Sequence, residues 1–212
     1  MTASQTLTLS EAGYVLDRSP TAINKVVDTG VIRARQRRVG KVVQRLLGPA
    51  ELRFLLLAEQ LEGDLTPAGR RRLYGAVKRL ASDAHRLTLG EIVLDLVRID
   101  EELHVRLQRL ERIRQKVDVG RDHDEPVIHG TAIPVYMVAA LAREETTDEI
   151  LDDYPSLTKE QVEAAVEYAK AYPKRGRPYP GRSLKRTLAD LAEIGVFEQG
   201  EERLTGAPRK IP

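Results

Sequence analysis

The amino-acid sequence predicts a mainly α-helical protein that is assembled from small modules. Apolar residues recur at steps of three and four along much of the chain, which is the spacing of one helix face. Only 4% of the 212 residues are aromatic, tryptophan is absent and 31% are charged. This composition favours thin helical cores over a deep pocket lined by aromatic side chains.

Net charge changes sign along the chain, although the whole chain carries only +2. Residues 1–50 hold eight Lys and Arg against three Asp and Glu, which gives +5, and residues 117–173 hold four against thirteen, which gives −9. Such asymmetry predicts different partners for different segments. Together with the helix signals, it divides the chain into four segments: 1–48, 49–116, 117–173 and 174–212.

Three absences narrow the class of protein. The sequence has no cysteine, which excludes disulfide bonds and thiolate metal sites. The N-terminal stretch MTASQTLTLS lacks a basic region followed by an apolar run, and no apolar stretch approaches the length of about 20 residues that spans a membrane. We therefore expect a soluble, cytoplasmic protein.

The first segment carries the pattern of a helix-turn-helix. Ser10 can cap a short first helix. Ser19-Pro20 then supplies an N-cap followed by proline at the first helical position, and the predicted second helix ends at Asp28, before Gly30. Two short helices joined by a brief turn are typical of proteins that place the second helix in the major groove of DNA.

A basic hairpin is predicted to follow. Residues 31–38 alternate, so Arg33, Arg35 and Arg37 should share one face of a strand. A turn at Gly40-Lys41 leads to a return strand over 42–46, and residues 33–45 hold six basic residues and no acidic one. This order of elements resembles the winged helix-turn-helix of MerR-type regulators over about the first quarter of the chain.

The resemblance implies that this segment binds DNA. Most of the arginines would contact phosphates, and Thr21, Asn24 or Lys25 would read base edges. The candidate DNA-binding residues are Ser19, Thr21, Asn24, Lys25, Arg33, Arg35, Arg37, Arg38, Lys41 and Arg45. The alternative for the same pattern is a basic surface hairpin beside an ordinary pair of helices.

The second segment is predicted to be helical. Gly48-Pro49 opens a helix over 50–61, and Thr66-Pro67 opens another that reaches Leu80. Beyond Gly90, a stripe of apolar residues describes one long helix, with these members: Ile92, Leu96, Ile99, Leu103, Leu107, Leu110 and Ile113. β-type residues at 87–89 and 92–94 leave its start open. The stripe either belongs to the core or pairs with a second copy of the chain in a homodimer.

The third segment contains two sequence signatures, EPVIHGTAIPV at 125–135 and EILDDYPSLT at 149–158. Gly130 permits a turn that a residue with a Cβ atom would strain, and Pro134 fits the first turn of a helix. Two capping boxes, beginning at Thr146 and Thr158, start two further helices. We expect a small three-helix bundle that is itself similar to a helix-turn-helix.

These signatures resemble the motifs G-x-P-V-I-x-G-T-R-I-P-V and E-I-L-x-D-Y-P-x-L-T of a prokaryotic family of small helical domains of unknown function, which often occur in antitoxins. The matching residues are Pro126, Gly130, Thr131, Ile133, Pro134, Asp153, Tyr154, Pro155 and Thr158. The chain departs from the family at Ala132, where the motif has arginine. Because a charge of −9 repels phosphates, we expect this segment to serve in dimerisation or protein contact.

The last segment combines a basic linker with a helix. Residues 173–182 are rich in Pro, Gly and Arg, and we expect them to be too polar and broken to pack. Ser183 caps an amphipathic helix. The resemblance to VapB-type antitoxins implies that this tail embraces a VapC-type toxin, a PIN-domain ribonuclease whose acidic residues hold metal. The candidate partner-binding residues are Arg175, Arg177, Arg182, Leu184, Leu188, Leu191, Ile194 and Phe197. The alternative is a helix that folds back on its own chain.

The sequence thus predicts the antitoxin of a type II toxin–antitoxin pair, which binds operator DNA and a PIN-domain toxin. A free-standing transcriptional regulator is the first alternative, and a nuclease that uses acidic residues of 117–153 is the second. Phosphate loops, nucleophile elbows and dinucleotide fingerprints are absent, and the four histidines are scattered. We therefore expect no enzymatic activity, no cofactor and no metal.

Overall fold

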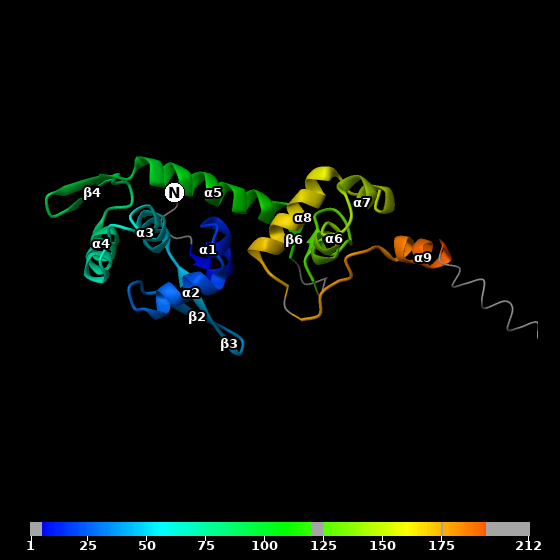
Figure 1. The fold of residues 1–212 in the computed structure, drawn as a ribbon, viewed down its shortest axis with the longest axis horizontal. Coiled ribbons are helices and arrows are strands. Elements are labelled where there is room, and N and C mark those ends of the chain that lie inside the picture. Colours follow the sequence, from blue (N-terminus) through cyan, green and yellow to red (C-terminus); the bar gives the residue numbers. More distant parts are fainter. Residues whose placement is uncertain (1–5, 120–124, 175, 194–212) are drawn as a thin grey trace, which may run out of the picture. The chain divides into compact units, whose positions relative to one another are not determined.

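The computed structural model describes residues 6–119, 125–174 and 176–193 (Figure 1). The described chain is rich in helices and contains three small antiparallel sheets. It divides into two compact units. The first comprises residues 1–115 and 170–173, and the second comprises residues 116–169 and 174–212.

The first unit begins with a pair of helices and a three-stranded sheet. Its elements are β1 (Leu7–Thr8), α1 (Leu9–Val15), α2 (Pro20–Asp28), β2 (Arg35–Val39) and β3 (Val42–Leu47). The strands lie in the order β1-β3-β2, and all pairs are antiparallel. Gly40, with a φ of +59°, makes the turn between β2 and β3, where a left-handed backbone favours glycine.

Two sequence predictions are wrong in this region. Thr8 caps the first helix in place of Ser10, because Thr8 and Glu11 form a reciprocal capping box and Ser10 lies inside α1. Arg33 precedes β2, so of the three arginines predicted to share a strand face only Arg35 and Arg37 do so. The expected start of the second helix is confirmed, since the Ser19 hydroxyl accepts a hydrogen bond from the Ala22 amide at 3.1 Å and Pro20 follows.

The rest of the first unit again has two helices followed by a hairpin, and it ends in a long helix. These elements are α3 (Pro49–Gln60), α4 (Pro67–Arg79), β4 (Arg86–Leu89), β5 (Ile92–Asp95) and α5 (Val97–Gln115). α4 also begins after a hydroxyl N-cap and a proline, and Gly90, with a φ of +67°, turns the second hairpin. The predicted long helix starts at Val97, since Ile92 belongs to a strand. α5 packs against α1 and α3 (Figure 1).

The core of the first unit is aliphatic, with few aromatic rings. Phe54, which meets the Tyr74 ring edge-on at 5.3 Å, is buried among leucine and isoleucine side chains. A buried ion pair joins α3 to α5, with Arg53 Nε 2.6 Å from an oxygen of Asp100, and His85 contacts the other oxygen of Asp100 at 2.8 Å. The aliphatic core and this ion pair hold α3 against α5.

The second unit contains β6 (Val117–Asp118), β7 (Val127–Ile128), α6 (Val135–Leu141), α7 (Thr147–Asp153), α8 (Lys159–Ala171) except for its last two residues, and α9 (Leu184–Glu193). β6 and β7 form a short antiparallel ribbon. Both predicted capping boxes are confirmed: Thr146 pairs with Glu149, and Thr158 pairs with Gln161. Pro134 is the N-cap of α6, one position earlier than expected. In the described ranges, no helix is long and apolar enough to cross a membrane.

Candidate functional site

The hairpin β2–β3 carries cations on both of its faces. In its register Arg37 lies opposite Gln44, Arg38 opposite Val43 and Gln36 opposite Arg45. Cross-strand partners share a face, so Arg35 and Arg37 lie on one face, whereas Arg38 and Arg45 lie on the other. The side chain of Arg37 donates to Gln44 Oε1 at 3.2 Å, which is a neutral partner.

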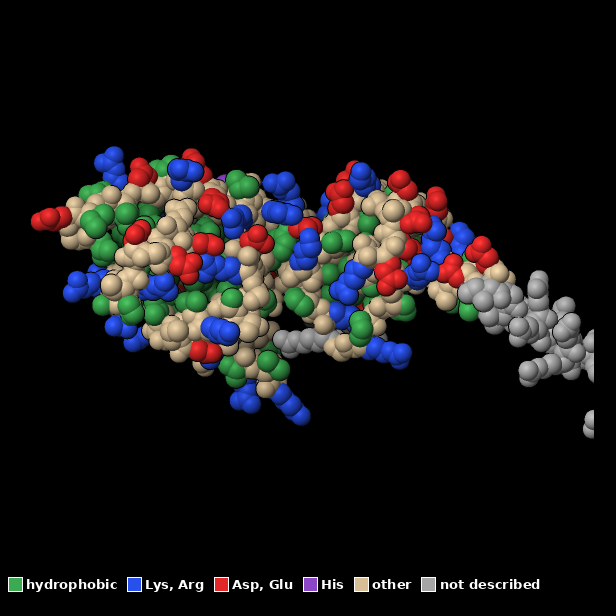
Figure 2. Space-filling view, in the orientation of Figure 1, with side chains coloured by type: hydrophobic (Ala, Val, Ile, Leu, Met, Phe, Trp, Pro, Cys, Tyr) green, Lys and Arg blue, Asp and Glu red, His purple; other side chains and the backbone are tan. Residues whose placement is uncertain are grey.

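The tip of this hairpin mixes charge with apolar side chains. Lys41 is exposed at the turn. Val39, Val42 and Val43 are 48%, 47% and 57% exposed. Figure 2 shows Lys and Arg side chains gathered at this end of the first unit beside hydrophobic ones. The tip can therefore meet a surface that combines anionic groups with apolar ones.

Helix α2 presents only part of its predicted set of residues to solvent. Thr21 and Lys25 are exposed, whereas Asn24 is half-buried and already bonded. Asn24 Oδ1 accepts a hydrogen bond from Arg45 Nη1 at 2.7 Å, and Asn24 Nδ2 donates to Asp28 at 3.1 Å. Arg45 also pairs with Asp28 at 2.5 Å. This cluster fixes β3 to α2. Sequence reasoning missed Asp28, for which the four-residue spacing from Asn24 was the available signal.

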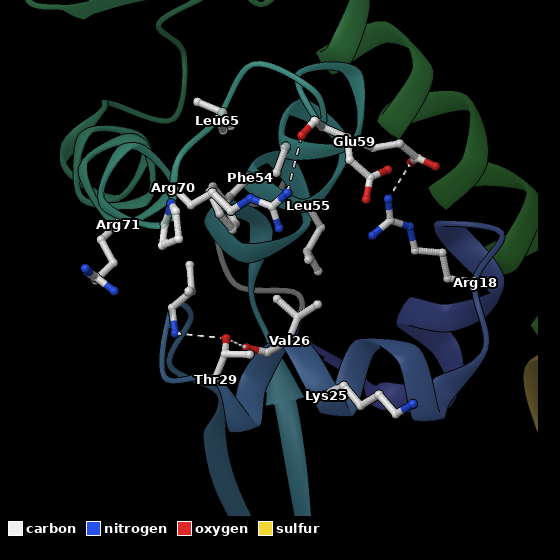
Figure 3. Close-up of a pocket in the computed structure, with 14 residues that line it drawn as sticks. Arg18, Lys25, Val26, Thr29, Phe54, Leu55, Glu59, Leu65, Arg70 and Arg71 are labelled. Atoms are coloured by element: carbon white, nitrogen blue, oxygen red, sulfur yellow. Dashed lines mark hydrogen bonds and ion pairs between the residues drawn. The ribbon is translucent and has the colours of Figure 1, made fainter.

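A cavity of about 630 Å³ opens between α2, α3 and the start of α4 (Figure 3). Its lining combines apolar side chains such as Phe54 and Leu55 with cations such as Arg18 and Arg70. Sequence reasoning did not anticipate this cavity. Arg18 lies in the turn between α1 and α2 and Arg70 lies in α4, so only the fold brings them to one opening.

In the second unit, the first signature forms a tight turn that precedes α6. The Ile128 amide donates to the Ile133 carbonyl, and the Val135 amide donates to the Pro126 carbonyl, both at 2.9 Å. Gly130 has a φ of +76° in this turn. The Thr131 hydroxyl donates to the Ile128 carbonyl. Ala132 is exposed here, so the arginine that the motif has at this position would have room to point into solvent.

The acidic surface of the second unit is covered in part by the chain's own tail. Arg186 lies among three carboxylates, with nitrogen–oxygen distances of 3.1 Å to Glu149, 3.6 Å to Asp153 and 3.8 Å to Glu145. The Ser183 amide donates to Glu145 at 2.8 Å. The Glu145 and Asp153 side chains are only 4% and 5% exposed, so these contacts neutralise charges that are shielded from water.

Two further contacts of the tail lower the pKa of one of these carboxylates, Asp153. Lys185 Nζ lies 2.9 Å from Asp153, and the Ser183 hydroxyl donates to Asp153 at 2.5 Å. The Lys185 ammonium and the Ser183 hydroxyl hold the pKa of Asp153 below its ordinary value. The predicted helix cap at Ser183 is also present, since its hydroxyl accepts from the Arg186 amide.

The linker before α9 packs, contrary to the sequence prediction. Lys174 pairs with Glu125 and lies over the Tyr136 and Tyr179 rings, at 5.4 and 4.6 Å from the ring centroids. The Tyr179 hydroxyl donates to Glu125 at 3.0 Å, and the Lys174 hydrogen bond lowers the pKa of Glu125. The prediction counted polar residues and did not consider that cations can stack on tyrosine faces.

The predicted partner-binding residues fall into three groups. Arg182 contacts Glu144 and Asp190, so its charge has partners within the chain. Leu184 and Leu188 are 74% and 45% exposed, Leu191 is half-buried and Arg177 is exposed. Three lie outside the described residues: Arg175, Ile194 and Phe197. Within its described length, α9 therefore turns cations toward its own unit and leaves leucines in contact with solvent.

Titratable residues give little sign of a metal centre in the described ranges. His129 Nδ1 lies 2.9 Å from Asp118, and His85 contacts Asp100. Among the residues that the structure describes, no group of three His, Asp or Glu side chains is arranged to hold a metal ion.

Part of this chain is similar in sequence to known proteins. Residues 117–169 match a family described as "Protein of unknown function (DUF433)". This segment contains both sequence signatures and supports the resemblance drawn from them. It is a quarter of the chain, so the match describes only the small bundle of the second unit.

A curated relative is the uncharacterized protein y4eO of Sinorhizobium fredii (strain NBRC 101917 / NGR234), which is 34% identical over 109 residues. The alignment covers 50% of this chain and 46% of the relative, so the chain spans about half the length of the curated relative that it matches. Among solved structures, the crystal structure of Rv2018 from Mycobacterium tuberculosis covers 76% of this chain and 96% of that chain. It is 14% identical, with a TM-score of 0.31. That likeness is too low to support an argument about this chain.

Proposed function

We propose that the protein is a DNA-binding antitoxin of a type II toxin–antitoxin pair, in which the first unit binds operator DNA and α9 binds a PIN-domain ribonuclease toxin. The observation that carries the proposal is the hairpin β2–β3 beside α2. Four cations are exposed on this hairpin, and no acidic residue occurs between Arg33 and Arg45. A solvent-exposed cationic hairpin next to a capped helix suits a winged helix-turn-helix, with α2 in the major groove and the hairpin on the phosphates.

The contacts within this region separate two roles. Arg35, Arg37 and Arg38 are exposed and have no carboxylate partner among the described residues, so they can meet phosphates without breaking an ion pair. Asn24 and Arg45 are held by Asp28. We therefore assign phosphate contacts to the exposed hairpin arginines and base contacts to Thr21 and Lys25. Asn24 and Arg45 serve mainly to fix the angle between β3 and α2.

The toxin-binding part of the proposal rests on the exposed leucines of α9. Burying Leu184 and Leu188 against a partner contributes about 1.5–3 kcal/mol per side chain before ordering costs. Lys185 and Arg186 anchor the other side of the helix to Asp153 and Glu149. An anchored helix loses less entropy when a partner covers its apolar stripe, because its position is already restricted.

We extend the proposal to a cytoplasmic homodimer without enzymatic activity. Val97 and Val105 on α5 are 41% and 60% exposed, which supports contact with a second copy along this helix. Two-fold symmetry would match a palindromic operator.

A free-standing regulator is the second candidate, and one observation favours it. The ion pairs of Lys185 and Arg186 with the second unit give the tail a place without any partner. The two candidates differ in the role of the leucines, because a regulator has no need to expose them.

Duplex binding by the full chain tests the DNA part. We expect the double substitution Arg35→Gln/Arg37→Gln to weaken binding to every duplex, as measured by fluorescence anisotropy. The matched control Arg98→Gln/Arg112→Gln removes two exposed arginines of α5 and should leave the affinity within a factor of three. Equal losses in the two variants would contradict the assignment of the hairpin.

Co-purification with a PIN-domain ribonuclease encoded next to this chain tests the toxin part. Leu184→Ser/Leu188→Ser should abolish complex formation while the urea unfolding midpoint stays unchanged, because both side chains are largely exposed. The control Lys185→Gln/Arg186→Gln should retain the complex with reduced affinity. Absence of a complex with the unsubstituted chain would favour the regulator. An intact complex in the leucine variant would contradict the assignment of toxin binding to α9, and a lowered midpoint would show that the helix packs on its own chain.

A further inference from the structure

The cavity between α2, α3 and the start of α4 has no role in the proposed function. Its volume of about 630 Å³ lies within the range of about 300–1,000 Å³ that is usual for small-molecule sites. All residues that line it belong to the first unit. It is therefore a feature of one compact body, and its shape does not depend on the placement of the second unit.

The floor of the cavity is apolar. Phe54 and Leu55 are core residues of α3, at 1% and 2% exposure. Val26 of α2 and Ala58 of α3 are half-buried beside them. Figure 3 shows Val26 and Leu55 pointing toward one another across the space. Such a floor can contact the apolar part of a ligand, but its side chains offer no hydrogen-bond partner.

The rim of the cavity is cationic, and one arginine on it is poorly satisfied. The lining holds four cations against two carboxylates, and Arg18 is paired with Glu59 at 3.1 Å. Arg70 lines the same cavity as the apolar residues Phe54 and Leu55 (Figure 3). Within the described residues its guanidinium donates to the backbone carbonyl of Glu62 at 3.5 Å, which is a weak contact for a charged group.

We infer that this cavity binds a small amphipathic organic anion, whose carboxylate or sulfonate pairs with Arg70 while its apolar body covers Val26, Leu55 and Ala58. A planar guanidinium suits such an anion, because it can donate two parallel hydrogen bonds. Partial burial beside apolar side chains strengthens the pair relative to an exposed one. Only the first unit's own geometry enters this inference, so it stands apart from the proposed function.

The chain offers a matched pair of variants for the test. Arg70 and Arg72 lie on the same helix, but only Arg70 lines the cavity, and Arg72 is exposed. Arg70→Gln and Arg72→Gln change the net charge equally. A third variant, Ala58→Phe, fills the floor, and circular dichroism melting would verify that each variant is folded.

The probe is 8-anilinonaphthalene-1-sulfonate, an apolar body with one anionic group, and its uncharged counterpart is N-phenyl-1-naphthylamine. With the full chain, we expect saturable fluorescence with one site and tighter binding of the anion. Arg70→Gln should weaken anion binding at least tenfold and change binding of the neutral probe by less than threefold. Arg72→Gln should match the unsubstituted chain.

Three results would overturn the inference: equal losses in Arg70→Gln and Arg72→Gln, equal affinity for both probes, or binding without saturation. Loss of duplex binding in Arg70→Gln with unchanged probe binding would also overturn it, because the rim would then belong to a nucleic-acid surface. Should Ala58→Phe fail to fold, the comparison of Arg70→Gln with Arg72→Gln still decides the outcome.

Discussion

The segments α1–α2–β2–β3 and α3–α4–β4–β5 share an order of elements but place their charges differently. The first hairpin carries four exposed cations and no acidic residue, whereas Arg86 is accompanied by Glu91 and Asp95 in the second. The helices show the reverse, since α4 contains five cations and α2 contains a single lysine with one aspartate.

This contrast shows that local backbone signals determine the helices and turns of each segment, whereas exposed side chains determine the partner that each segment can bind. A hydroxyl N-cap followed by proline starts both α2 and α4, and a left-handed glycine turns both hairpins. Those signals build the same local structures twice. The chemistry that each copy offers to a partner depends on exposed side chains, which the signals do not constrain.

The largest expected difference between the two segments concerns the carboxylates that pair with their arginines, Asp28 of α2 with Arg45 and Asp100 of α5 with Arg53. Asp100 is 8% exposed and bonds to Arg53 and His85, so Asp100→Ala leaves a buried guanidinium without its partner. We expect a loss of about 3–5 kcal/mol in the free energy of unfolding. Asp28→Ala should cost at most about 1 kcal/mol, because the Asp28 side chain is 54% exposed. Urea unfolding of both variants measures the difference, and equal losses would contradict this account.

The second-largest expected difference concerns dimerisation through the exposed apolar residues at the tips of the two hairpins. Ile92 and Val93 are 60% and 62% exposed without a cluster of cations around them, so they can meet a second copy of the chain. We expect Ile92→Ser/Val93→Ser to raise the dimer dissociation constant at least tenfold. Val42→Ser/Val43→Ser should leave it unchanged, because like charges at the first tip repel. Sedimentation equilibrium measures both dissociation constants. A change only in the Val42→Ser/Val43→Ser variant would contradict the assignment of the dimer contact to the tip of β4–β5.

The cations of α9 differ from those of the first hairpin, because they are paired with carboxylates of the same chain. The pKa of Asp153 is lowered by Lys185 and Ser183, so the attachment of α9 is fully present above the ordinary aspartate pKa. It weakens as pH falls below about 4, through the lowered pKa. We expect the amide resonance of Arg186 to shift in that range, because this amide donates to the Ser183 hydroxyl, which itself donates to Asp153. Asp153→Asn should remove most of this dependence, and a shift centred near neutral pH would contradict the assignment.

Local signals predicted much of this fold. Ser19-Pro20, Thr66-Pro67 and the two capping boxes start helices where the sequence indicates. The sequence leaves the strand at Ile92 undecided, because a short apolar run fits a helix stripe and a strand equally well. Thr8 was missed as a cap, because Ser10 is also a preferred N-cap residue and only the reciprocal bond to Glu11 distinguishes them.

The parts of the candidate site that escaped prediction depend on contacts distant in sequence. The cavity joins Arg18 to Arg70, and the tail joins Arg186 to Glu145. No spacing rule relates such residues, and the Pro, Gly and Arg content of 173–182 therefore predicts a linker that does not pack. The basic hairpin could be predicted because its residues are adjacent in sequence and alternate with the strand period.

Salt dependence of duplex binding tests the central claim most directly, namely that the cations of β2–β3 and not those of α4 meet the phosphates. The measurement compares Arg35→Gln/Arg37→Gln with Arg72→Gln/Arg79→Gln, which remove equal charge from exposed positions. In a plot of log affinity against log salt concentration, we expect the slope to flatten by about 0.9 per lost contact in the hairpin variant and to stay unchanged in the α4 variant. Equal flattening in both variants, or flattening in the α4 variant alone, would contradict the claim.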